Sequence, residues 1–113
     1  MNQLELKLQA TCFQWYWNHF PQYRRLLHAN NNNSENQIKG NQNKAIGVVA
    51  GVADMELNFM ARTYFFEFKT ATGTQSPEQK EFQERVTQHG FEYHIIRSVD
   101  RFKELITEIH LRA

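Results

Sequence analysis

The chain has 113 residues, one cysteine and a formal net charge of +1. This length fits a single domain spanning residues 1–113, and the hydrophobic content of 41% is sufficient for a core. The lone Cys12 excludes an internal disulfide framework and a cysteine-rich zinc site. The charge excludes a chain that holds nucleic acid by overall attraction alone. Apolar runs are far shorter than the roughly 18 residues of a membrane span, and no secretory signal pattern is present, so we expect a cytoplasmic protein without a membrane partner.

The first third of the chain predicts one long helix followed by mostly irregular structure. Residues 4–20 favour a buried helix that Pro21 ends, because apolar positions recur every three to four residues. The helix carries more large aromatic residues than one face needs: Phe13, Trp15, Tyr16, Trp17 and Phe20. Residues 24–29 predict a short strand, and the polar tract 30–36 predicts a surface loop. Residues 37–46 predict a short helix.

The middle of the chain predicts a hairpin of two strands. Residues 52–57 and 63–69 are rich in strand-forming side chains, and residues 58–62 are expected to form the turn between them. If these strands pair antiparallel, Asp54 and Glu67 can meet across the pair.

The clearest helix boundary in the sequence follows this hairpin. Ser76 is expected to cap a helix, with Pro77 at its first position and Gln79 completing a capping box. The helix should run to about residue 89, where Gly90 supplies a left-handed stop.

A strand over residues 93–97 and a last helix over residues 100–110 complete the predicted elements. One face of the last helix gathers four large apolar residues: Phe102, Leu105, Ile106 and Ile109. The whole order of elements predicts an α/β fold, with one mixed β-sheet flanked by helices.

Three charged residues of the predicted hairpin could carry chemistry. Glu67 and Lys69 alternate along one strand and should share a face, whereas Phe68 should point into the opposite layer. Asp54 and Glu67 would repel each other if close, and a hard divalent cation relieves that repulsion. With Lys69 to orient or deprotonate a water, this is the minimum set for metal-assisted phosphodiester hydrolysis. The same triplet is also compatible with an ordinary solvated strand face.

The residues around this triplet resemble a known family. The segments that carry the resemblance are Gly51-Val52-Ala53-Asp54, Phe66-Glu67-Phe68-Lys69-Thr70, Gly73, Ser76-Pro77-Glu78-Gln79-Lys80-Glu81-Phe82 and Gly90, together with Glu5, Gln9 and Asn30. This ordered set is similar to the VRR-NUC (virus-type replication–repair nuclease) domain of the PD-(D/E)XK nuclease superfamily, over about residues 5–100. The family has a proline before the aspartate where this chain has Ala53. The resemblance implies a restriction-endonuclease-like fold.

The resemblance also implies a metal centre. Asp54 and Glu67 would bind Mg²⁺ or Mn²⁺, and the carbonyl of Phe68 would be a further ligand. Glu5 would complete the acidic cluster, through a second metal or a water; the alternative is an exposed acid at the start of a helix.

The same resemblance assigns roles in the reaction and in DNA binding. Lys69 would position the attacking water, and Gln79 would contact that water or a DNA phosphate, in addition to its capping role. Basic residues that flank the predicted site could neutralise phosphates, or simply form a solvated surface. These are Arg24, Arg25, Lys39, Lys44 and Lys80.

The expected function is therefore that of an Mg²⁺- or Mn²⁺-dependent endodeoxyribonuclease in the cytoplasm of a bacterial or phage-infected cell. The expected substrate is branched DNA, such as a four-way (Holliday) junction in DNA repair, because so small a chain has no separate module for reading sequence. Family members that stand alone resemble junction-cleaving homodimers, and the surplus aromatic residues of the first helix could form the dimer surface. A catalytically inactive DNA-binding module and a sequence-specific restriction-type endonuclease are the alternatives.

Overall fold

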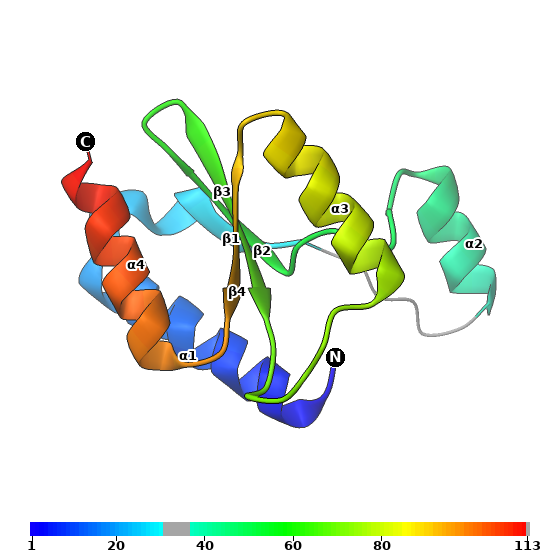
Figure 1. Cartoon of the computed structure of the whole chain (residues 1–113), viewed down its shortest axis with the longest axis horizontal. Helices are drawn as coiled ribbons and strands as arrows, with labels where there is room; N and C mark the ends of the chain where they lie inside the picture. The colour runs from blue at the N-terminus through cyan, green and yellow to red at the C-terminus, as the bar shows by residue number, and fades with distance from the viewer. Residues whose placement is uncertain (31–36, 113) are drawn as a thin grey trace.

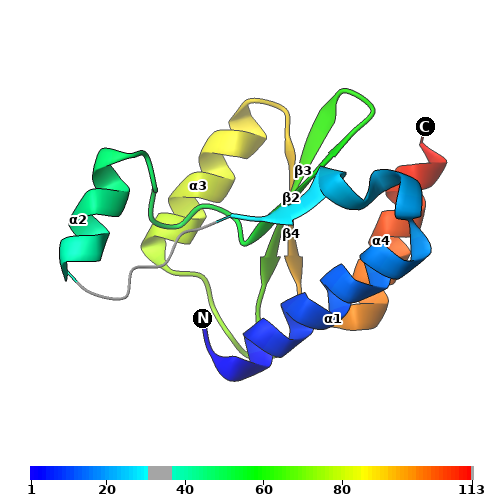
Figure 2. The ribbon, with the colours of Figure 1, turned by 180° about the vertical axis from the view of Figure 1, so that it is seen from behind.

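The computed structural model describes residues 1–30 and 37–112 of the chain. Within these ranges the helices are α1 (Gln3–His19), the 3₁₀ helix η1 (Pro21–Leu26), α2 (Gln37–Ala45), α3 (Pro77–Gln88) and α4 (Val99–Leu111). The strands are β1 (Leu27–Ala29), β2 (Met55–Phe59), β3 (Arg62–Phe68) and β4 (Glu92–Ile96). Figure 1 shows these elements in one view, and Figure 2 shows them from behind.

The strands form one sheet in the order β1-β2-β3-β4. Strands β1, β2 and β3 pair antiparallel, whereas β3 and β4 pair parallel. A parallel connection needs a crossover, and α3 provides it between β3 and β4. The predicted mixed sheet flanked by helices is confirmed.

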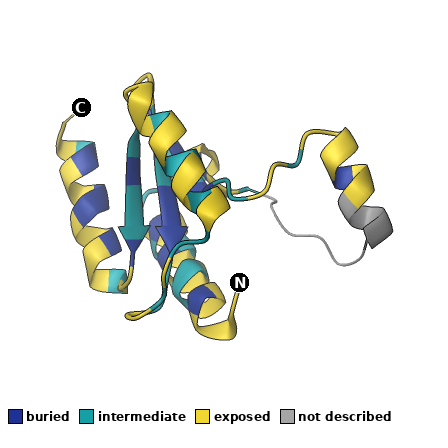
Figure 3. Ribbon diagram, turned by 45° about the vertical axis from the view of Figure 1, so that its right-hand side comes forward, coloured by how far each residue is buried: buried dark blue, intermediate teal, exposed yellow. Residues whose placement is uncertain are grey.

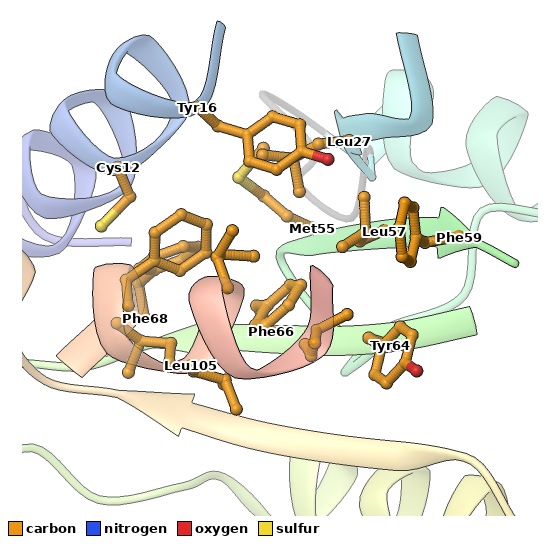
Figure 4. Close-up of a cluster of buried hydrophobic side chains, with 14 residues drawn as sticks. Cys12, Tyr16, Leu27, Met55, Leu57, Phe59, Tyr64, Phe66, Phe68 and Leu105 are labelled. Atoms are coloured by element: carbon orange, nitrogen blue, oxygen red, sulfur yellow. The ribbon is translucent and has the colours of Figure 1, made fainter. Parts of the chain in front are cut away.

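Helices cover both faces of this sheet (Figures 1 and 2). On one face, the ring of Phe66 in β3 packs edge-on against Phe102 of α4, at a centroid distance of 5.3 Å. On the other face, Phe65 packs against Phe82 of α3 at the same distance. The hydrophobic core lies between the sheet and the layer of α1 and α4, and Figure 4 shows side chains from both layers meeting there. Among the described residues, α2 contacts no other helix or strand (Figure 3).

The last helix confirms its predicted buried face. All four predicted residues, Phe102, Leu105, Ile106 and Ile109, are buried. Figure 3 shows a buried stripe along α4 on the side that faces the sheet. Side chains spaced by three and four residues share one side of a helix, so this stripe follows directly from the sequence.

The first helix is less buried than the sequence predicts. The buried residues of α1 are Glu5, Cys12 and Tyr16, whereas Leu4 is exposed. The surplus aromatics are not a free surface, because Phe13, Trp15 and Phe20 pack against the core, which leaves Trp17 as the exposed member of the set. Trp15 and Phe20 contact α4 through Phe102 and His110, at ring-centroid distances of 6.1 and 4.4 Å.

The predicted strand over residues 24–29 is wrong in its first half. Pro21 starts the 3₁₀ helix η1, and only Leu27–Ala29 pairs with β2. Proline fixes a backbone angle that suits a first helical position, so the chain turns before it extends.

The hairpin between β2 and β3 is tighter than the predicted turn over residues 58–62. Its tip consists of Met60 and Ala61, with φ angles of 51° and 63°, because Phe59 already pairs with Arg62. Left-handed backbone at both positions matches the twist of two-residue hairpins, although neither residue is one that favours it.

The third helix begins and ends close to the predicted residues. Ser76 and Gln79 form the predicted capping box at the start of α3, and Gly90 follows its end with φ of 86°. No helix in the described part of the chain is long and apolar enough to cross a membrane.

Candidate active site

Asp54 lies immediately before β2, at the end of the strand pair that the sequence singled out. The β2–β3 register pairs Met55 with Phe66, so its continuation by one residue places Asp54 opposite Glu67. The Asp54 carboxylate accepts a hydrogen bond of 2.7 Å from the backbone N–H of Phe68. The predicted meeting of the two acids across the hairpin is therefore borne out.

Asn30 fixes the backbone that leads into Asp54. Its backbone N–H donates to the carbonyl of Asp54 at 2.9 Å, and its side-chain amide donates to the carbonyl of Ala53 at 3.1 Å. Two bonds to consecutive carbonyls hold this end of β2 against β1. The asparagine is thus part of the frame of the site.

Glu67 is almost completely buried, with 1% of its surface exposed. Its Oε1 accepts hydrogen bonds from the hydroxyl of Tyr93 and from the side-chain amide of Gln75. Its Oε2 accepts no hydrogen bond and lies 3.9 Å from the Nζ of Lys69. The carboxylate therefore has one satisfied oxygen and one free oxygen.

The alternation predicted along β3 is confirmed. Lys69 and Glu67 point to the same side, whereas the ring of Phe68 enters the core and lies 6.1 Å from that of Phe102. The backbone N–H of Lys69 donates to the carbonyl of Ile96, which ties this residue to the end of β4.

A pocket of about 380 Å³ opens beside these residues. Five residues with predicted roles line it: Glu5, Asp54, Phe68, Lys69 and Gln79. The first turns of α1 and α3 form two of its walls, through Asn2 and Ser76 among others. The capping boxes occupy backbone N–H groups of Asn2, Glu5, Ser76 and Gln79, while the helix dipole still gives each helix start a partial positive charge.

Of the two interpretations of Glu5, the exposed acid at the start of a helix is wrong. It is buried, and it forms a capping box with Asn2, whose side-chain oxygen accepts from the Glu5 backbone N–H at 2.8 Å. A Cβ built on Gly73 would lie 3.6 Å from the Glu5 Oε2. The loop after β3 therefore passes within van der Waals distance of this carboxylate.

Gln79 uses only part of its amide for capping. Its Oε1 accepts from the backbone N–H of Ser76 at 2.8 Å. This leaves the Nε2 donor for the pocket, since Gln79 lines it. An amide N–H can donate to a phosphate or a water but cannot bind a metal.

Gly51 brings the loop before Asp54 against the start of α3. Its φ is 83°, and a Cβ at this position would lie 2.5 Å from the backbone carbonyl of Glu78. Only glycine allows both the left-handed backbone and the close approach. This explains the glycine that precedes Asp54 in the sequence.

The electrostatics of the site centre on Asp54. Burial raises the pKa of Asp54 from 3.8 to about 6, the Phe68 N–H and Lys69 oppose this rise, and the carboxylates of Glu67 and Glu5 add to it. The acids are therefore close enough to feel each other. A divalent cation would relieve this repulsion.

The donor set fits a hard divalent cation at Asp54 and Glu67. The orphaned Oε2 of Glu67 is a buried oxygen in need of a partner, and Asp54 lies opposite it. Oxygen donors of this kind suit Mg²⁺ or Mn²⁺. The described residues contain no group of three or more His, Cys, Asp or Glu side chains that could hold a metal, so Glu5 is not drawn into such a cluster.

The predicted DNA-binding residues are not gathered around the pocket. Arg24 stacks over the ring of Trp17 at 4.9 Å, and with Arg25 it lines a different, apolar groove beside α1 and β1. Lys80 is exposed in α3, next to Gln79, and Lys44 is exposed at the end of α2. Lys39 lies in α2, and its side chain is outside the described part of the structure.

The sequence interpretation missed the residues behind Glu67. Tyr93 reaches it from β4 and Gln75 reaches it from the loop before α3. Neither stands in a recognisable motif, because the Tyr93 contact depends on the parallel register of β3 and β4 and the Gln75 contact depends on the path of the loop before α3.

Comparison with known proteins supports the fold. A scan against models of protein families finds no match, and a search of curated proteins finds none either. Among solved structures, a VRR_NUC domain protein matches with a TM-score of 0.78 and 18% sequence identity. The match covers 96% of this chain and 88% of that chain. The chain therefore has the fold of a VRR_NUC domain protein, an α/β restriction-endonuclease-like mixed sheet flanked by helices.

Proposed function

We propose that this protein is an Mg²⁺- or Mn²⁺-dependent endodeoxyribonuclease that hydrolyses phosphodiester bonds in DNA. The observation that carries the proposal is that Asp54, which lines the pocket with Lys69, lies opposite the buried Glu67, whose Oε2 is 3.9 Å from the Lys69 ammonium. The shared fold with a VRR_NUC domain protein supports the same class of reaction.

Asp54 and Glu67 would hold the metal, with the backbone carbonyl of Phe68 as a further oxygen donor. The bound cation would supply Lewis-acid activation of the phosphodiester and of a water. Glu5, whose carboxylate is buried at the same pocket, would contact the metal through a water or a second cation.

Lys69 would position the attacking water. Its ammonium lies 3.9 Å from Glu67 Oε2, and its side chain is only 12% exposed, so it is held close to the metal-binding oxygen. A fixed ammonium donates hydrogen bonds to a water in one orientation only. Removing it should therefore impair the chemical step rather than metal binding.

The pocket walls would hold the DNA phosphate. The Nε2 of Gln79 offers a hydrogen-bond donor at the pocket, and the starts of α1 and α3, which line it, carry the positive ends of the helix dipoles. Lys80 is exposed one residue beyond Gln79 and would contact a neighbouring phosphate, as would Lys39 and Lys44 on α2. The two arginines of η1, Arg24 and Arg25, would contact DNA further from the site.

We further propose branched DNA as the substrate and a homodimer as the active form. An apolar groove of about 610 Å³ lies between α1 and β1, and Leu6 and Trp17 on its wall are 51% and 41% exposed. A second copy of the chain would cover the apolar wall of this groove. A two-fold dimer would match the symmetry of a four-way junction.

A panel of labelled DNAs tests the substrate. Four-way junction, flap, single-stranded and linear duplex DNAs are incubated with Mg²⁺ or Mn²⁺, and the products are sized. Cleavage of the branched substrates supports the proposal. Metal-independent binding of DNA without cleavage would instead indicate a DNA-binding module. Discrete fragments from linear duplex DNA would indicate a restriction-type enzyme.

The variant Lys69→Ala tests the mechanism. We expect cleavage to fall at least about 100-fold, because an oriented general acid–base group contributes roughly 10²–10⁴. Calorimetric Mn²⁺ affinity should change little. Lys103→Ala, which removes an exposed lysine from α4, is the matched control. Turnover near that of the wild type in Lys69→Ala would disprove the assigned role.

A further inference from the structure

A buried hydrogen-bond network treats the two oxygens of Glu67 differently. The Tyr93 hydroxyl and the Gln75 amide both donate to Oε1. The second N–H of the same amide donates to the side-chain oxygen of Gln83 at 2.8 Å, so both hydrogens of this amide are used. Oε2 receives no hydrogen bond, although it is buried.

The residues around Glu67 in this network come from three separate elements. Tyr93 stands on β4, Gln75 in the loop before α3, and Gln83 on α3 itself. The ring of Tyr93 is buried beneath α3, with its centroid 6.1 Å from that of Phe82. The hydroxyl is therefore held in place by packing, and not only by its bond to Glu67.

We propose that Tyr93 and Gln75 are positioning residues that fix the rotation of the Glu67 carboxylate and present its Oε2 to the metal and to Lys69. This inference rests on the proposed function, since it names the residues that prepare one of its ligands. Tyr93 is the main determinant, because it is rigid and buried, and Gln75 supports it from the loop.

The physical argument concerns freedom of rotation. A carboxylate that has two equivalent oxygens can turn, and it then offers a metal either oxygen at a poorly defined angle. Two donors on Oε1 remove this freedom and leave Oε2 as the oxygen that still needs a partner. Groups that orient a metal ligand from behind change metal affinity or activity by about 10–100-fold.

The test compares wild type with Tyr93→Phe, which keeps the buried ring and removes the donor. Mn²⁺ affinity is measured by isothermal titration calorimetry, and kcat and KM are measured on the best DNA substrate of the panel. We expect Mn²⁺ affinity to weaken about 10-fold or more. We also expect kcat at subsaturating metal to fall by a similar factor while the KM for DNA stays within twofold.

Two further variants separate positioning from general stability. Tyr16→Phe removes another buried tyrosine hydroxyl, on the opposite face of the sheet, where it contacts His110 Nε2 at 3.0 Å. This control should lower the melting temperature without changing Mn²⁺ affinity. Gln75→Leu removes the second donor from a half-buried loop position, and it should weaken Mn²⁺ binding in the same direction as Tyr93→Phe.

The outcomes are distinct. Weaker Mn²⁺ binding in Tyr93→Phe and Gln75→Leu, but not in Tyr16→Phe, supports the proposal even if Tyr93→Phe is less stable. Unchanged Mn²⁺ affinity in both variants, while the wild type binds metal and cuts DNA, overturns the proposal and leaves the proposed function standing. A wild-type protein that neither binds Mn²⁺ nor cuts DNA overturns both.

Discussion

At the scale of single residues, the candidate site contains carboxylates whose charged form is destabilised by burial. Asp54 is buried with a pKa of about 6, and Glu67 beside it has one oxygen without a hydrogen bond. Such groups cost stability in the folded state, and proteins commonly accept this cost where function requires it. The cost can be measured directly.

Asp54→Asn should stabilise the metal-free protein at neutral pH. The folded chain holds a proton on Asp54 between pH 3.8 and about 6, where the unfolded chain has lost it, so wild-type stability falls as the pH rises through this range. The asparagine side chain of the variant does not titrate, so Asp54→Asn avoids this loss of stability, which is about 3 kcal/mol above pH 6. Urea unfolding in EDTA at pH 4 and pH 7 measures the difference, which should be small at pH 4.

The matched control is Glu108→Gln, which neutralises an exposed acid on α4 and should leave stability nearly unchanged. Added Mn²⁺ should raise the melting temperature of the wild type and of the control, but not that of Asp54→Asn. An Asp54→Asn protein less stable than wild type at pH 7 in EDTA would contradict the electrostatic account.

The sequence predicted the site residues that local strand geometry brings together. It missed the site residues that other elements bring to Glu67. Alternation along β3 places Glu67 and Lys69 on one face, and a short hairpin can pair Asp54 with Glu67. Tyr93 and Gln75 depend on how β4 and the loop before α3 sit beside β3, which no local pattern encodes. Glu5 was predicted from the family resemblance, and the structure places it buried at the pocket.

At the scale of elements, predictability followed the strength of the local signals. The capping box and terminal glycine of α3 and the apolar stripe of α4 are local features, and both helices form as expected. In α1 the aromatic residues surround the helix, so periodicity could not select its buried face. For η1, Pro21 favoured a helical turn where strand propensity alone suggested extension.

Gly51→Ala should disturb the packing of the loop before β2 against α3. The added Cβ would lie 2.5 Å from backbone atoms of Glu78, and the residue would also be left-handed. We expect a loss of at least about 2 kcal/mol in the free energy of unfolding, since left-handed backbone alone costs 1–2 kcal/mol. Because Glu78 and Gln79 line the pocket, DNA cleavage should fall as well.

Gly90→Ala is the matched control for this prediction. Gly90 has a similar φ of 86°, but a Cβ there would meet no atom within 4 Å. It should show the backbone cost alone, with cleavage per folded molecule unchanged. Equal losses of stability and activity in the two variants would show that the approach to α3 is unimportant.

At the scale of the whole molecule, one histidine joins elements from both ends of the chain. The ring of His110 in α4 packs against Phe20, Tyr23 and Phe59, at centroid distances of 4.4, 5.1 and 4.3 Å. Its Nε2 lies 3.0 Å from the Tyr16 hydroxyl. These contacts link α4 to α1, η1 and β2.

Acid should weaken these contacts. Burial lowers the pKa of His110 below 6.5, so the unfolded chain takes up a proton on this ring before the folded chain does. The His110 contribution to stability is therefore present above pH 6.5 and declines as the pH falls below it. In His110→Gln, stability should change less between pH 7 and pH 5 than in wild type, as measured by urea unfolding. Parallel pH profiles would refute this.

The proposed homodimer makes a separate prediction at this scale. Trp17 lines the apolar groove beside α1 and β1 and is exposed in the single chain. Light scattering at micromolar concentration should give about twice the chain mass of 13.5 kDa for wild type, and the single-chain mass for Trp17→Glu. Trp17→Phe should remain dimeric. A monomeric wild type that cuts both strands of a junction in one binding event would argue against the dimer.

The hairpin tip offers a practical advantage that is independent of the site. Met60 and Ala61 have left-handed backbone, which asparagine and glycine adopt at lower cost. A chain carrying Met60→Asn and Ala61→Gly should therefore unfold at a higher temperature, by roughly 4–8 °C for each kcal/mol gained. The added stability would provide a robust background in which destabilising changes at the pocket can be assayed as folded protein. A melting temperature equal to that of wild type would show that the left-handed backbone at the tip costs no measurable stability.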